Sequence, residues 1–182
     1  MTDNKKSKSN PSLEGPAVDD IVTLLEIEAI KQLKARYCRH LDTKNWAAWR
    51  EVFAADFVSD TSEAGGAVII GADKFVAFTR KNIGKAWQLT AHQVHAPEIE
   101  LTSATTARGV WALNDVVRLL PALSLNAYGH YDETYEKIDG QWSIKTSKLT
   151  RLREDMITPI FSLRISERLR NAGARLARRS TD

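Results

Sequence analysis

The stretch AHQVHAPEIELTSATTARGVWALNDVV, residues 91–117, decides the fold, because its apolar and polar side chains alternate with a period of two. This period is typical of half-buried β-strands and not of helices. It continues on both sides of the stretch, from Gly84 to about residue 153. Four strands are therefore predicted, over residues 89–101, 105–119, 127–138 and 141–153, the last two joined by a tight turn at Asp139-Gly140.

The strand register within this stretch follows from its turn. A turn centred on Ser103-Ala104 pairs residues whose numbers sum to 207, so His92 faces Asp115 on the neighbouring strand. Opposed side chains in an antiparallel pair have Cβ atoms roughly 5 Å apart, which is within reach of a hydrogen bond. The next pairs are apolar and indicate an inward face: Val94 with Leu113, and Ala96 with Trp111.

Before Gly84 the apolar residues recur every three or four positions, which indicates helices. Helices followed by an antiparallel meander predict an α+β cone, with three N-terminal helices on the concave face of a curved, mostly antiparallel sheet. The predicted segments are helices over 19–41, 46–53 and 72–82, the third with Phe75 and Phe78 inward, and a strand from Phe57 that pairs with 68–70.

Length and composition are those of one ordinary domain. The chain has 182 residues, 27% of them charged, and no apolar run near the ~20 residues that a membrane span requires. The sequence predicts a disordered arm over residues 1–18, the domain over residues 19–156, and an arginine-rich helix or tail over residues 157–182. The single Cys38 cannot form an internal disulfide and the polar start lacks a secretory signal, so a cytoplasmic location is expected.

The net charge of +3 comes from the C-terminal segment, where six arginines stand against Glu167 and Asp182. The middle of the chain is neutral and has no basic patch with interleaved aromatic residues, so nucleic acid is not an expected partner. Neither a glycine-rich phosphate loop nor a Cys-His cluster occurs in the sequence. His92 and His95 point to opposite faces of one strand and cannot chelate one ion, so neither a metal nor a cofactor is expected.

His92 and Asp115 are a candidate acid–base pair. A carboxylate beside an imidazole selects the tautomer of the ring and raises its basicity, as a general base requires. The alternative is a core histidine that is simply satisfied by Asp115. Tyr37 and Asp42 lie at the end of the first predicted helix, where the tyrosine also suits a core position and the aspartate a cap.

Four runs of the sequence carry a family resemblance: IEAIKQLKARYCRHLDTKNW (27–46), AHQVHAPEIE (91–100), ARGVWALNDVV (107–117) and YEKIDGQWSIK (135–145). They resemble the SnoaL-like branch of the NTF2-like superfamily, and within it the bacterial bile acid 7α-dehydratases, over about residues 26–156. The branch also holds scytalone dehydratase and hexachlorocyclohexane dehydrochlorinase. The sequence departs from the resemblance at residues 116–128 and in the C-terminal segment, which would shape the pocket mouth or an oligomer.

The resemblance implies a catalytic set of Tyr37, Asp42, His92 and Asp115, with Arg151 at the mouth of a substrate pocket. A solvated sheet edge explains Arg151 almost as well. The implied reaction is cofactor-independent loss of water from a hydroxylated steroid, such as a 3-oxo-Δ4 7α-hydroxysteroid. His92 would be the base, oriented by Asp115, and Tyr37, supported by Asp42, would bind the oxygen that gains charge. The roles of the two aspartates are interchangeable at this level.

Two other functions stay open, because a fold does not specify a reaction. One is isomerisation or cyclisation on the same scaffold, and the other is a non-catalytic ligand-binding module. In each case the expected partner is a hydrophobic small molecule. A homo-oligomer is also expected, a trimer first by resemblance and a dimer second, since apolar residues on the convex face would otherwise be exposed: Val116, Tyr128 and Leu149.

Overall fold

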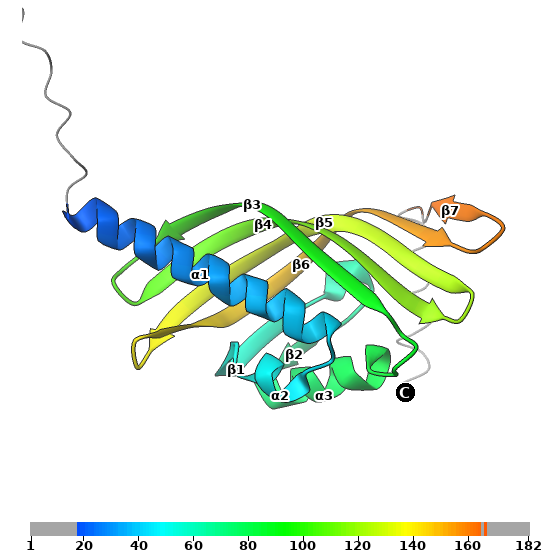
Figure 1. Ribbon diagram of the computed structural model, residues 1–182, viewed down its shortest axis with the longest axis horizontal. Coiled ribbons are helices and arrows are strands. Elements are labelled where there is room, and N and C mark those ends of the chain that lie inside the picture. Colours follow the sequence, from blue (N-terminus) through cyan, green and yellow to red (C-terminus); the bar gives the residue numbers. More distant parts are fainter. Residues whose placement is uncertain (1–17, 165, 167–182) are drawn as a thin grey trace, which may run out of the picture.

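A computed structural model describes residues 18–164 and 166 of the chain. Three helices and a short 3-10 helix accompany one curved sheet (Figure 1). The helices are α1 (Val18–Asp42), α2 (Trp46–Arg50), η1 (Ser62–Ala64) and α3 (Ala72–Ile83). The strands are β1 (Phe53–Asp60), β2 (Val68–Ile70), β3 (Thr90–Leu101), β4 (Thr106–Leu120), β5 (Leu123–Ile138), β6 (Gln141–Ile157) and β7 (Ser162–Arg164).

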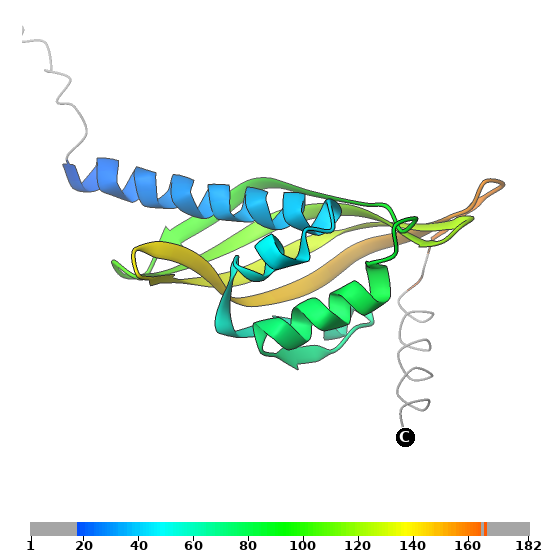
Figure 2. The ribbon, with the colours of Figure 1, turned by 60° about the horizontal axis from the view of Figure 1, so that its bottom comes forward.

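The sheet has the strand order β2-β1-β6-β5-β4-β3, and β7 pairs with the end of β6. Among the strands of the described residues, β1 and β6 form the one parallel pair, and the other pairs are antiparallel. Helix α1 lies across the long strands, and α2 and α3 follow beside its C-terminal end (Figures 1 and 2). This arrangement confirms the predicted α+β cone. Among the described helices, none has both the length and the apolar character of a membrane span.

The turn at Asp139-Gly140 has the predicted geometry, with φ of 50° and 79° at the two positions. Positive φ at both central residues is what a type I′ hairpin requires. The predicted arm falls outside the described residues except for Val18, which begins α1. The predicted tail is described over residues 157–164 and 166, where the sheet continues through the end of β6 and through β7, so these first residues of the segment are not helical.

The β3–β4 hairpin pairs His92 with Asp115, as predicted, but for a different reason. Near the turn the partners sum to 208, as in the pair Leu101 and Ala107. A β-bulge between His95 and Glu98 then inserts one extra residue into β3 and changes the sum to 207. Pro97 lies in this bulge and has no N–H to give to a ladder.

The predicted pair of Ala96 and Trp111 is wrong, because Ala96 is part of the bulge and has a φ of 31°. The bulge also reverses the facing of β3. Before the bulge the partly buried residues are the even-numbered His92 and Val94. After the bulge they are the odd-numbered Ile99 and Leu101. His95 is exposed on the opposite face from His92, as expected.

The core beneath the C-terminal half of α1 is aromatic. The rings of Trp49, Phe53, Phe57 and Phe75 have centroids 4.4 to 5.5 Å apart. Burying each such side chain contributes roughly 1.5–3 kcal/mol, so this cluster holds α1, α2, α3 and β1 together. Because it packs against the end of α1, it also positions Asp42, the last residue of that helix.

Three predicted placements were wrong. Phe53 belongs to β1 and not to a helix, because α2 ends after little more than one turn. Phe78 is 42% exposed, since the inner stripe of α3 runs through Ala72 and Phe75 to Val76. Leu149 is buried with Trp111 on the inner side of the sheet, so it adds nothing to an exposed convex face.

Candidate active site

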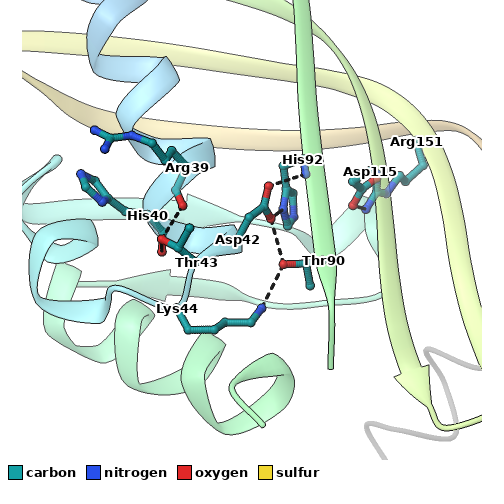
Figure 3. Close-up of polar contacts among 9 residues, drawn as sticks. All are labelled: Arg39, His40, Asp42, Thr43, Lys44, Thr90, His92, Asp115 and Arg151. Atoms are coloured by element: carbon teal, nitrogen blue, oxygen red, sulfur yellow. Dashed lines mark hydrogen bonds and ion pairs between the residues drawn. The ribbon is translucent and has the colours of Figure 1, made fainter. Parts of the chain in front are cut away.

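His92 and Asp42 form the central contact of the site (Figure 3). Asp42 ends α1, and His92 lies on β3. Nδ1 of His92 lies 2.7 Å from Oδ1 of Asp42, and the backbone N–H of His92 donates to Oδ2 at 2.8 Å. A carboxylate can only accept a hydrogen bond, so the ring nitrogen that it contacts, Nδ1, carries the proton. The neutral ring then keeps its lone pair on Nε2, which is the tautomer of a general base.

A second chain of hydrogen bonds leads from Asp42 to the loop after α1. The ammonium of Lys44 donates to Oγ1 of Thr90 at 2.9 Å, and the same hydroxyl donates to Oδ1 of Asp42 at 2.8 Å (Figure 3). Because Lys44 can only donate, the single hydroxyl hydrogen of Thr90 is directed toward Asp42. Lys44 sits in the left-handed region, with a φ of 58°.

These contacts keep Asp42 ionised. Burial of the carboxyl opposes ionisation, but the hydrogen bonds and charge of His92 and the hydroxyl of Thr90 outweigh it, so the pKa of Asp42 lies below its usual value. The carboxylate accepts from three donors on β3, which hold it against that strand. Asp42 is therefore a fixed negative charge beside the imidazole.

Asp115 does not orient His92, contrary to the sequence hypothesis. It pairs with Arg151 through two hydrogen bonds, from Nη1 to Oδ1 at 2.6 Å and from Nη2 to Oδ2 at 2.9 Å. The two side chains are only 4% and 6% exposed, so Arg151 is not on a solvated sheet edge. Burial opposes the charge on Arg151, but the contact with Asp115 prevails and raises the pKa of the guanidinium.

Small residues on β5 explain how Arg151 reaches Asp115 from β6 across an intervening strand. Ala127 is the β5 partner of Asp115, and Gly129 is the β5 partner of Arg151. Gly129 has no side chain, and a Cβ there would lie 1.9 Å from the carbonyl oxygen of Thr150. The long guanidinium side chain can therefore lie over β5. This pair of small residues is the signal that sequence reasoning missed.

Tyr37 is buried, and its hydroxyl is hydrogen-bonded to Tyr131 of β5 and not to Asp42 as predicted. Burial is the main cause that raises the pKa of both phenols, followed for Tyr37 by the charges of Tyr131 and Glu133. Both hydroxyls therefore stay protonated and act as hydrogen-bond donors. Tyr131 is a site residue that the sequence analysis did not identify.

A fully buried ion pair lies directly behind the two tyrosines. Nζ of Lys34 is 2.6 Å from Oε1 of Glu133, and both side chains have no exposed surface. The same ammonium lies 4.2 Å from the ring centroid of Tyr37 and 3.7 Å from that of Tyr131. The sequence signal was available, because Lys34 falls on the apolar stripe of α1 between Ile30 and Tyr37.

Glu133 is satisfied on both oxygens. Ser147 donates to Oε1 at 2.9 Å and Tyr135 donates to Oε2 at 2.6 Å, while the indole of Trp111 donates to the hydroxyl of Tyr135 at 2.7 Å. A buried carboxylate is tolerated only when it is paired in this way. The network therefore fixes the inner side of the sheet behind the tyrosines.

The arrangement combines one base with a polar surrounding. His92 offers Nε2, Asp42 supplies a charge that stabilises the imidazolium, Tyr37 is a neutral donor, and Asp115 with Arg151 forms a neutral ion pair. Such a set can move a proton and bind a developing oxyanion. Within residues 18–164 and 166, no three His, Cys, Asp or Glu side chains gather as metal ligands would.

Comparison with known proteins gives one family and one fold. The SnoaL-like domain family matches residues 22–148. A "Putative Scytalone Dehydratase" from Novosphingobium aromaticivorans is 25% identical, with a TM-score of 0.66 over 74% of this chain and 89% of that one. The LinA-type3 hexachlorocyclohexane dehydrochlorinase of Novosphingobium barchaimii is 15% identical, with a TM-score of 0.66 over 81% and 95%.

A third similar structure is a protein of unknown function from Mycobacterium tuberculosis. It is 23% identical, with a TM-score of 0.62 over 71% of this chain and 78% of that chain. At these identities the second and third likenesses establish the fold alone.

Proposed function

This chain belongs to the SnoaL-like family, and we propose that it is a cofactor-independent lyase that removes water from a hydroxylated hydrophobic substrate. The observation that carries the proposal is the hydrogen bond between Asp42 and Nδ1 of His92, which leaves a basic Nε2 on the inner side of the sheet. Two similar structures bear the names of a dehydratase and a dehydrochlorinase, both of which denote eliminations.

The first step of the proposed reaction is proton abstraction. Nε2 of His92 takes a proton from the carbon that lies beside the hydroxyl-bearing carbon and is conjugated with the carbonyl through a C=C bond, which is C6 in a 3-oxo-Δ4 7α-hydroxysteroid. The C–H electron pair moves into a dienolate, and the carbonyl oxygen becomes negative. Asp42 stabilises the imidazolium, since the contact between ring and carboxylate becomes charge-assisted. The hydroxyl of Tyr37, which donates to Tyr131 in the free protein, turns its hydrogen to the enolate oxygen.

The second step returns the proton. The enolate electrons form a new C=C bond, the C–O bond of the hydroxyl breaks, and the departing hydroxide takes the proton from Nε2 of His92 to become water. The imidazole is neutral again, so neither an oxidant nor an added acid is consumed. A general acid–base group of this kind typically contributes ~10²–10⁴-fold to the rate.

Arg151 and Asp115 are proposed to contact the substrate as a pair. Nε of Arg151 is buried and makes no hydrogen bond with any described residue, although Oε1 of Glu154 lies 3.8 Å from it as an ion-pair partner. A buried donor without an acceptor costs roughly 1–3 kcal/mol, which a substrate oxygen would recover. Asp115 holds the guanidinium in place for this contact.

We propose 3-oxo-Δ4 steroids with a 7α-hydroxyl as the substrate class, in line with the sequence resemblance. The test is incubation of the purified protein with such steroids carrying a 7α- or a 12α-hydroxyl. From the 7α-hydroxysteroid we expect a product lighter by one water, with the long-wavelength absorbance of a conjugated diene. The 12α-hydroxysteroid should not react, because no C–H beside its hydroxyl is conjugated with the carbonyl.

The variant His92→Ala should abolish turnover, whereas His95→Ala, on the exposed face of the same strand, should leave it unchanged. A product of unchanged mass would instead identify an isomerase. Normal dehydration by His92→Ala would refute the assignment of the base.

A further inference from the structure

A groove separate from the His92 site runs along the other side of α1. It has a volume of about 590 Å³, which is within the range of small-molecule sites. Its walls are α1 from Leu25 to His40, the segment after α2, and the β5–β6 hairpin. The 15 steps from Leu25 to His40 along α1 span roughly 22 Å, at 1.5 Å per residue. None of Tyr37, Asp42, His92 or Asp115 lines the groove.

The middle of the groove is apolar, and the end near the start of α1 carries no net charge. Ala29, Leu33 and Val52 line the middle, together with Trp142. At the end near the start of α1, Glu26 accepts from Lys137 and from the indole of Trp142, each at 2.6 Å. The charge of Glu26 is thus already compensated.

The other end carries one cation, Arg36, and the acidic side chain of Glu51 on the opposite wall. Arg36 and His40 lie one turn apart on α1 and line the groove, and neither side chain pairs with another described residue. Figure 3 shows Arg39 and His40 on the far side of α1 from His92. Burial lowers the pKa of His40, and the charges of Arg39 and Arg36 lower it further. Glu51 on the opposite wall makes no ion pair with either residue in the described structure.

We propose that this groove binds a single-chain amphiphilic carboxylate, with its head on Arg36 and His40 and its alkyl chain along Ala29, Leu33 and Trp142. The length and the apolar middle suit an alkyl chain. At one end the guanidinium of Arg36 suits one anionic head, and the imidazole of His40, whose lowered pKa keeps it neutral near pH 7, can donate a hydrogen bond to that head. A carboxylate there would gain charge-assisted hydrogen bonds from a guanidinium that has no acceptor among the described residues. This proposal is independent of the dehydratase reaction.

The test uses decanoate, below the concentration at which it forms micelles, with the full-length chain in a calorimetric titration. We expect saturable binding of one decanoate per chain. The variant Arg36→Gln should weaken binding about tenfold or more, the effect of losing one charge-assisted contact. The matched control is Arg39→Gln, which removes the same charge from the same helix at a residue outside the groove wall.

Two further measurements locate the site. In an NMR titration, decanoate should shift the resonances of His40 and leave those of His92 unchanged. Ala29→Trp should block binding, and its thermal melt should be recorded to show that it folds; Arg36→Gln is a surface change and tests the proposal on its own. Equal weakening by Arg36→Gln and Arg39→Gln, a shift of His92 instead of His40, or binding that does not saturate would each overturn the proposal.

Discussion

Replacement of Asp42 by asparagine tests the site most directly, because the geometry leaves the amide no satisfactory orientation. Oδ1 accepts from the ring of His92 at 2.7 Å and from Thr90 at 2.8 Å, while Oδ2 accepts from the backbone N–H of His92 at 2.8 Å. An asparagine NH₂ at either position would face at least one donor. If the NH₂ group faces Nδ1, it donates to that nitrogen, so the imidazole proton moves to Nε2. Nε2 then has no lone pair with which to act as the base.

The expected size of the effect follows from these contacts. Asp42→Asn should lower kcat/KM by ~10²–10⁴-fold, the range for loss of a general base, because the imidazolium also loses its charged partner. The cost in stability should be modest, roughly 1–3 kcal/mol for one unsatisfied polar contact. The assays are steroid dehydration and urea unfolding of the same preparation.

Asp115→Asn is the matched comparison. It leaves the guanidinium of Arg151 buried with a neutral partner, and breaking a buried ion pair typically costs ~3–5 kcal/mol. We therefore expect the Asp42 variant to lose mainly rate and the Asp115 variant to lose mainly stability. The reverse pattern would refute the reasoning and restore Asp115 as the partner of His92.

Three further outcomes are expected. Folding lowers the pKa of Asp42, so the contribution of this carboxylate to stability is complete above about pH 4 and is lost as the pH falls through the pKa of the folded state. The unfolding free energies of the wild type and of Asp42→Asn should therefore converge in acid. Lys34→Met should destabilise the protein by ~3–5 kcal/mol because it strands the buried Glu133, and adding Glu133→Gln should recover part of the loss in the same unfolding assay; no recovery would argue against the pair. Val116 and Tyr128 are each 39% exposed on the convex face, so we expect a trimer, or else a dimer, by light scattering, and a monomeric mass would contradict this.

The periodicity of the sequence was enough to predict the three helices, the four long strands and their layering, although not β7, which falls in the segment predicted as a helix or tail. A change from a period of three or four to a period of two near Gly84 predicts helices before a meander, and the structure confirms this. The pair Asp139-Gly140 predicts its hairpin because few residues adopt the required positive φ. Such signals depend on residues that are close in the chain, so they can be interpreted without knowledge of the tertiary packing.

The partners of the polar residues were decided only by the tertiary structure. The pairing of His92 with Asp115 as strand neighbours was correct because a bulge at Pro97 offset an error of one residue at the turn. Two residues that face each other on neighbouring strands do not have to bond to each other. Asp115 forms its ion pair with Arg151 across Gly129, and His92 forms its hydrogen bond with Asp42 of α1. Fifty residues separate His92 from Asp42 in the chain, and only the docking of α1 on the sheet brings them within 2.7 Å. That docking is stabilised by burial of apolar side chains, among them Leu41 on α1 and Val94 on β3.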